Sequence, residues 1–260
     1  MNPNTYWQVL GESVAGTAHV KRTIPCQDAF GFQRFGPEDG WLVVAVADGA
    51  GSASHSDVGS RIACDELVRY VVDLPPETDY SNLDVSRAFA GAREAVCAKA
   101  AELGLRPRDL AATALLAVVG PESAVFGQVG DGAIVIGDGS AYRTVFWPEI
   151  EEFVNVTNFL TETGFERHLL TTRLGESIRD LALMTDGVQW LALDFALRQP
   201  HPEFFRPMFV PLRGGTDMTE LRPHFRSFLD SDRVNEKTDD DKTLFLASRC
   251  PRHAAAELPD

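Results

Sequence analysis

The sequence has few cysteines, no long apolar run and fewer basic than acidic residues, and each shortage excludes a class of protein. The four cysteines lie far apart without a Cys-x-x-Cys pair, which argues against a zinc knuckle or a redox dithiol and predicts reduced, partly buried thiols. No apolar run reaches the roughly 18 residues of a membrane span. The N-terminal residues also lack the basic and apolar regions of a signal peptide. We therefore expect a cytoplasmic protein that does not bind membranes.

Basic residues are too few for nucleic-acid binding. Lys and Arg number 24 against 38 Asp and Glu, so the formal net charge is −14, which argues against broad contact with a phosphate backbone. Such an acidic balance fits a solvated acidic surface or carboxylates gathered around cations, and composition does not separate the two. With 44% hydrophobic residues and no internal repeat, the 260 residues predict one globular domain over 1–260, with a frayed tail from about residue 249.

Apolar runs and their periodicity predict the main elements. A buried strand over 41–48 delivers an acidic loop, and helices follow over 56–74 and 83–103, the second ended by Gly104. Three β-rich runs then suggest consecutive antiparallel meander strands. Further elements are expected at these positions: the three runs at 110–120, 123–132 and 133–142, strands at 180–187 and 242–248, and a helix at 219–229.

Two regions are less regular. The region 145–179 is expected to contain a flap that faces the substrate, and the region 188–239 is rich in proline near 200–211. Strands, two helices, more strands and then helices with a last strand form a mixed pattern rather than strict βαβ alternation. This order predicts an α+β fold of packed antiparallel sheets flanked by helices.

Acidic residues repeatedly follow or precede the predicted strands. They are Asp28, Asp48, Asp131, Asp186, and the pair Asp240 and Asp241. A single Asp-Gly is most often a turn. Several at the ends of long apolar runs favour a different interpretation, because carboxylates at neighbouring strand ends supply the oxygen ligands that Mg²⁺ and Mn²⁺ prefer.

Six blocks carry a resemblance to a known family. The segments GESVAGTAHVKRTIPCQDAFG, VAVADGAGSASHSDVGSRIA, AATALLAV, FGQVGDGAIVI, LALMTDGV and DDKTLFLA occur in the order and approximate spacing of the metal-dependent protein phosphatases of type 2C (PPM). The resemblance spans about residues 10–247. It implies an α/β/β/α sandwich of two antiparallel sheets with helices outside, and a binuclear Mg²⁺ or Mn²⁺ centre at one end.

The resemblance also implies roles for individual residues. Asp48 would bridge the two ions, and the Gly49 carbonyl would bind one of them. Asp186 and Asp240 would complete the first ion site and Asp28 the second, while Asp131 matches an acid that helps to hold a third, weaker ion. Two cations activate a shared water for direct attack on a phosphomonoester. The absence of a Cys-x5-Arg loop and of a Gly-x-Ser-x-Gly elbow agrees with this chemistry.

The sequence departs from better-known members at two positions. Where they carry a phosphate-binding arginine this chain has Thr23, so Arg22 is the candidate, with a solvated basic residue as the alternative. Ala50 stands where some members place a proton-donating histidine. His19 and His55 are the candidates for that role. The alternative is that each is a surface histidine or a hydrogen-bonded loop histidine.

These observations predict a serine/threonine phosphoprotein phosphatase that uses Mn²⁺ or Mg²⁺, with two or three ions. Its expected partners are a phosphoprotein substrate and a cognate Ser/Thr kinase. Two alternatives stay open: a phosphatase of a small phosphorylated regulator, and a weak or inactive binding module of the same fold. Ala50 and the displaced arginine favour the last, whereas the retained acids argue against it.

Overall fold

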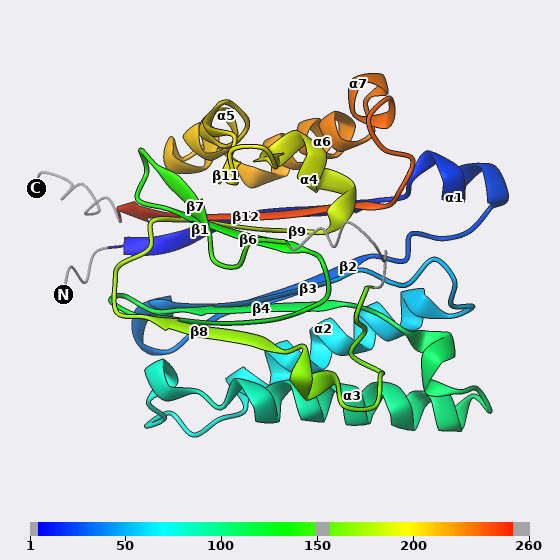
Figure 1. Cartoon of the computed structure of the whole chain (residues 1–260). Coiled ribbons are helices and arrows are strands. Elements are labelled where there is room, and N and C mark those ends of the chain that lie inside the picture. Colours follow the sequence, from blue (N-terminus) through cyan, green and yellow to red (C-terminus); the bar gives the residue numbers. More distant parts are fainter. Residues whose placement is uncertain (1–4, 149–156, 252–260) are drawn as a thin grey trace, which may run out of the picture.

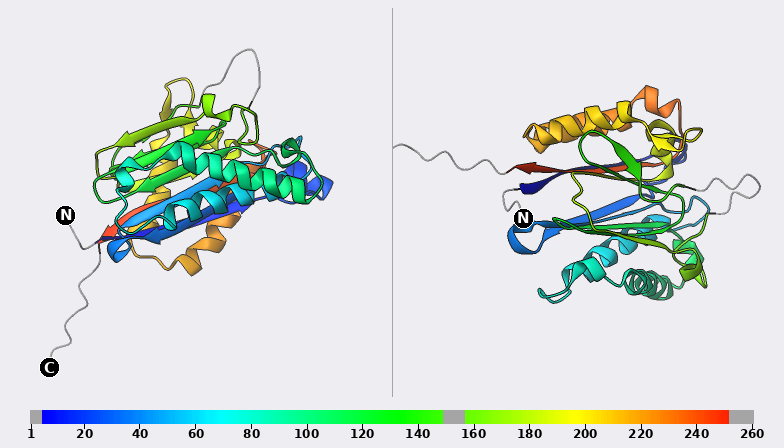
Figure 2. Two further views of the ribbon diagram at one scale, coloured as in Figure 1. Left: turned by 90° about the horizontal axis from the view of Figure 1, so that it is seen from below. Right: turned by 60° about the vertical axis from the view of Figure 1, so that its left-hand side comes forward.

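Two antiparallel sheets face each other, and helices cover the outer face of each, so the molecule has four layers (Figures 1 and 2). The computed structural model describes residues 5–148 and 157–251. The two five-stranded sheets and their flanking helices confirm the predicted α/β/β/α sandwich. Within the described residues, no helix is long and apolar enough to cross a membrane. All four cysteines are free thiols, as expected.

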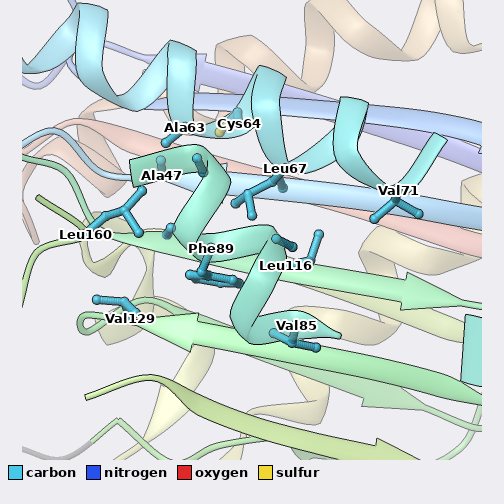
Figure 3. Close-up of a cluster of buried hydrophobic side chains, with 14 of the residues drawn as sticks. Ala47, Ala63, Cys64, Leu67, Val71, Val85, Phe89, Leu116, Val129 and Leu160 are labelled. Carbon is cyan, nitrogen blue, oxygen red and sulfur yellow. The ribbon is translucent and has the colours of Figure 1, made fainter. Parts of the chain in front are cut away.

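The first sheet has the strand order β2-β3-β4-β5-β8. Its strands are β2 (Ala29–Phe35), β3 (Trp41–Ala47), β4 (Ala114–Val119), β5 (Ala124–Val129) and β8 (Leu170–Leu174). Helices α2 (Ser56–Val72) and α3 (Val85–Glu102) lie across its outer face. Leu67 of α2 and Phe89 of α3 are fully buried there against Leu116 and other strand residues (Figure 3). This burial fixes the acidic loop between β3 and α2.

The second sheet has the order β1-β12-β9-β6-β7. Its strands are β1 (Thr5–Val14), β12 (Lys242–Pro251), β9 (Asp180–Met184), β6 (Ala133–Gly137) and β7 (Tyr142–Thr144). The helices α4 (Asp186–Ala192), α5 (Pro202–Arg213) and α6 (Met218–Leu229) cover its outer face. The short helices α1 (Thr17–Arg22) and α7 (Asp232–Asn235) and the hairpin β10 (Leu193–Asp194) and β11 (Gln199–Pro200) complete the fold.

The predicted meander is wrong in one respect. β4 and β5 pair within the first sheet, but β6 crosses to the second sheet and pairs with β7 and β9. The chain changes sheets at Gly130, whose φ of +96° suits glycine. β4 and β5 of the first sheet and β6 and β9 of the second are buried on both faces, so their hydrophobic pattern does not say to which sheet each belongs.

Three further elements differ from the prediction. The irregular region 145–179 contains β8, and its residues 149–156, within the predicted flap, lie outside the described residues. The proline-rich stretch forms α5, because buried Phe205, Phe209 and Leu212 on one face anchor it despite two internal prolines. The tail is not frayed at Arg249, which packs 4.2 Å from the Trp7 ring centroid and donates to the Ile178 carbonyl; residues 252–260 lie outside the described part.

Candidate active site

Strand register brings the predicted acids together in pairs. Ala29 pairs with Ala47, so Asp28 and Asp48 leave neighbouring strands side by side. In the second sheet Ala133 pairs with Met184, which places Asp131 next to Asp186 in the same way. The ends of β3 and β9 and the start of β12 lie at one end of the sandwich, beside α1 (right-hand side of Figure 1). Acids distant in sequence therefore converge there.

Burial and mutual repulsion act on these carboxyl groups. Burial foremost, and then the charges of Asp28 and Asp186, raise the pKa of Asp48 well above its usual range. Burial, Asp131 and Asp240 raise the pKa of Asp186 to about 6. The side chains of Asp48 and Asp186 are within hydrogen-bonding reach, and this contact favours a proton on Asp48. The cluster thus carries a cost in free energy that a cation would relieve.

Two acids keep an oxygen without a protein partner. Asp28 is 7% exposed, and burial raises its pKa well above the usual range. Its Oδ2 accepts a hydrogen bond of 2.8 Å from Thr185 Oγ1. Its Oδ1 and the Oδ1 of Asp186 are buried without a hydrogen-bond partner among the described residues. Buried polar atoms rarely stay unsatisfied, so these oxygens fit a cation-binding role.

Gly49 allows the loop after β3 to pass close to the chain before Asp28. A Cβ at this position would lie 2.5 Å from the Gln27 carbonyl oxygen, closer than real Cβ atoms come to backbone. Thr113 holds the same loop, because its Oγ1 accepts from the Asp48 amide at 2.9 Å and its own amide donates to the Asp48 carbonyl at 2.8 Å. Thr113 of the motif AATALLAV therefore fixes the backbone at Asp48. The sequence alone did not indicate this role.

Asp240 and Asp241 differ in their surroundings. Asp240 lies at the exposed rim, where burial and Asp241 raise its pKa against the lowering effects of the Asp241 amide and His19. Asp241 is 2% exposed, and both of its oxygens accept backbone N–H groups, from Gly16 and from Gln27. Of the two, Asp240 is better placed to face an ion, because among the described residues only its Oδ1 accepts a hydrogen bond, from the Asp241 amide. The buried position of Asp241 could not be read from a run of three aspartates.

Asp131 lies at the edge of the cluster, half-buried. Thr157 Oγ1 donates to its Oδ2 at 2.7 Å, and Gln189 of α4 donates to its carbonyl. In the described part of the chain, no group of three or more His, Cys, Asp or Glu side chains is arranged so that it could hold a metal ion. The cluster supplies oxygen donors of the type that Mg²⁺ and Mn²⁺ prefer, and in this respect the residues fit the ions.

The basic residues near the cluster divide into two kinds. Arg22 is exposed at the end of α1, and its guanidinium has no hydrogen bond or ion pair among the described residues. His19 on the same helix is buried, with Nδ1 2.9 Å from Asp241 Oδ1. His55 precedes α2 and contacts the Ser54 hydroxyl, while Ala50 is buried. The two candidate histidines are thus engaged with other residues, His19 with Asp241 and His55 with Ser54.

The sequence matches the family described as Protein phosphatase 2C over residues 15–229. The chain belongs to this family. A curated relative, Serine/threonine-protein phosphatase 3 of Escherichia coli (strain K12), is 34% identical over 247 residues, which cover 93% of this chain and 98% of the relative.

Solved structures share the protein phosphatase 2C fold. The serine/threonine phosphatase Stp1 of Staphylococcus aureus superposes with a TM-score of 0.60 at 16% identity, covering 95% of this chain and 97% of the other. RsbX in complex with magnesium gives a TM-score of 0.56 at 17% identity, covering 94% and 96% of the two chains. A point variant of a bacterial serine phosphatase reaches 0.65 at 14% identity, covering 94% and 98%. At such identities these likenesses establish the fold.

Proposed function

We propose that this protein phosphatase hydrolyses phosphoserine and phosphothreonine in proteins with the help of Mn²⁺ or Mg²⁺. The observation that carries the proposal is the convergence of Asp28, Asp48 and Asp186, whose carboxyl groups repel one another and include two buried oxygens without partners. Membership of the family and the 34% identical Serine/threonine-protein phosphatase 3 support this choice of substrate.

The acids would hold two ions, and a third more weakly. Asp48 and the Gly49 carbonyl, with Asp186 and Asp240, would hold the first ion, and Asp28 would serve the second directly or through water. Asp131 would contribute to a third. When bound, such ions supply a nucleophilic water near neutral pH and neutralise phosphate oxygens.

The remaining work falls to residues of the chain itself. Arg22 is exposed and has no partner among the described residues, and its helix α1 lies at the end of the sandwich where the acids meet, so its guanidinium is available for the phosphate of a substrate. With Ala50 buried in place of a histidine, the leaving oxygen receives its proton from solvent or from another group. The expected partners are a cytoplasmic phosphoprotein and the kinase that modifies it.

The alternative of an inactive binding module is less well supported. A module without turnover has no need to keep six acids at one end of the fold, where like charges and burial raise pKa values. The other alternative, a small phosphorylated regulator as substrate, uses the same site and differs only in the protein that is bound.

A phosphatase assay tests the proposal. The full chain is incubated with phosphothreonine peptides and with a small phosphoester, in chelator and after addition of Mn²⁺ or Mg²⁺. We expect hydrolysis only with divalent cation. Full activity in chelator would contradict the role of the ions, and no activity under any condition would favour the binding module.

A further inference from the structure

The buried carboxylate of Asp241 contacts three residues of one segment of the chain. Its Oδ1 accepts the Gly16 amide at 2.7 Å, and its Oδ2 accepts the Gln27 amide at 2.5 Å. The His19 ring also reaches Oδ1, with Nδ1 at 2.9 Å. All three partners come from the segment between β1 and β2, so one side chain at the start of β12 holds this whole segment.

These contacts lie directly beside two acids of the candidate site. Gln27 precedes Asp28 in the chain, so its bond to Asp241 fixes the backbone from which Asp28 projects. The Asp241 amide in turn donates to Asp240 Oδ1 at 2.8 Å. Asp241 therefore touches the supports of Asp28 and Asp240, although its own oxygens are already occupied by backbone donors.

His19 supplies the side-chain contact that completes this arrangement. It is 7% exposed, whereas its neighbours Val20, Lys21 and Arg22 are exposed. Nδ1 makes no aligned hydrogen bond, and its contact with Asp241 is electrostatic. We place the imidazole N–H on Nδ1, where it faces the carboxylate at 2.9 Å and offsets part of the cost of burying that carboxylate.

The backbone packing beneath His19 leaves little room for other arrangements. A Cβ on Gly16 would lie 2.3 Å from the Asp239 carbonyl oxygen, so the turn before α1 rests directly on the chain that carries Asp240. The Ala18 amide also donates to that carbonyl at 3.0 Å. Helix α1 is thus held against the acidic segment by its backbone as well as by His19.

We propose that His19 and Asp241 form a positioning pair. The pair holds Asp28 and Asp240 in the geometry that receives the cation, and neither His19 nor Asp241 binds the cation itself. This inference rests on the proposed function, because it assigns the pair to the same ion site. Residues that orient metal ligands typically contribute about 10–100-fold to metal affinity. The pair should therefore govern how tightly the ion binds more than the rate of hydrolysis once it is bound.

The test measures Mn²⁺ binding directly by calorimetry on the full chain, with far-UV circular dichroism to verify folding. We expect His19→Ala to weaken Mn²⁺ binding by about tenfold or more. His19→Asn, whose amide can donate from the Nδ1 position, should recover most of that affinity. Turnover at saturating Mn²⁺ should stay within about threefold of the wild type, because the pair touches no reacting atom.

Ser248→Ala is the matched control. Ser248 Oγ donates at 2.6 Å to another buried carboxylate, that of Asp180, at the opposite end of β9. This variant should lower the melting temperature and leave Mn²⁺ affinity unchanged. If His19→Ala does not fold, His19→Gln replaces it. The glutamine amide reaches the position of Nε2 rather than that of Nδ1, so this variant should also bind Mn²⁺ more weakly.

The outcomes separate the two proposals. Wild-type affinity in the folded His19 variant, or an equal loss of affinity in Ser248→Ala, would overturn the positioning pair and leave the proposed function intact. Failure of His19→Asn to recover affinity would also overturn it. A wild-type chain that binds no Mn²⁺ would overturn the proposed function and the positioning pair together.

Discussion

Asp48 and Asp186 come from different sheets of the sandwich, yet their carboxyl groups meet within hydrogen-bonding reach. Asp48 follows β3 in one sheet, and Asp186 follows β9 in the other. Their contact therefore depends on the stacking of the two sheets. It also favours a shared proton when no cation is present, which makes the stability of the site sensitive to pH and to metal.

The pH dependence of stability in chelator follows from these raised pKa values. Burial first, then Asp131 and Asp240, raise the pKa of Asp186 from 3.8 to about 6. Between these values the folded state binds more protons than the unfolded chain, so stability falls as the pH rises through the window, and the raised pKa values of Asp28 and Asp48 act in the same direction. We expect the metal-free protein to melt at a higher temperature at pH 5 than at pH 7.

Calorimetric melting in chelator at the two pH values checks this expectation. Acids with a lowered pKa, such as Asp138 at about 2, titrate below the window and do not reverse the sign. With saturating Mn²⁺ the advantage of pH 5 should shrink, because protons then compete with the ion. A metal-free protein that is less stable at pH 5 than at pH 7 would show that repulsion among the buried carboxylates does not destabilise the fold.

Asp240 and Asp241 should respond differently to the same substitution. Asp240→Asn removes a proposed ligand charge and should lower turnover by orders of magnitude even at saturating Mn²⁺. Asp241→Asn should mainly raise the Mn²⁺ concentration needed for half-maximal activity, because Asp241 acts through its neighbours. Titration of activity against Mn²⁺ for both variants measures the difference. Equal loss of turnover in the two would mean that the ligand in this run is misassigned.

Arg22→Ala tests the phosphate-binding role of the exposed guanidinium. If the side chain binds phosphate in the ground state, KM for a phosphopeptide should rise roughly tenfold, the effect of losing a hydrogen bond to a charged group. If it also stabilises the transition state, kcat should fall as well. Lys21→Ala is the control, since Lys21 is an exposed neighbour on the same helix. Unchanged constants in Arg22→Ala would assign Arg22 to the solvated surface.

Much of the fold could be predicted because local patterns and tertiary structure agree. The apolar run of β3 ends at Asp48, and the helices α2 and α3 lie within two residues of their predicted ends. The pairing of β6 could not be predicted, because β4, β5 and β9 are all buried along their whole length and offer β6 equally apolar partners. Helix α5 could not be predicted because Pro207 and Pro211 disfavour a helix. In the folded chain, the burial of Phe205 and Phe209 outweighs the unfavourable effect of these prolines on helix stability.

The candidate site also has features that could be predicted from the sequence and features that could not. Repeated Asp-Gly motifs at strand ends indicated which acids converge, and strand register explains why they do. The supporting contacts of Thr113, Thr185 and Asp241 carry no such signal, since they depend on which backbone groups lie opposite in the folded chain.

The central claim is that the acids form an ion site, and melting of wild type and Asp48→Asn in chelator and in millimolar Mn²⁺ tests it most directly. Ions that bind only the folded state add about 2.7 kcal/mol per site at 100 times the dissociation constant. At about 2–4 °C per kcal/mol, the wild type should gain several degrees with Mn²⁺. Asp48→Asn should melt at or above wild type in chelator, because repulsion is removed, and gain little from Mn²⁺. A wild type without a shift, or an equal shift in Asp48→Asn, would contradict the ion site.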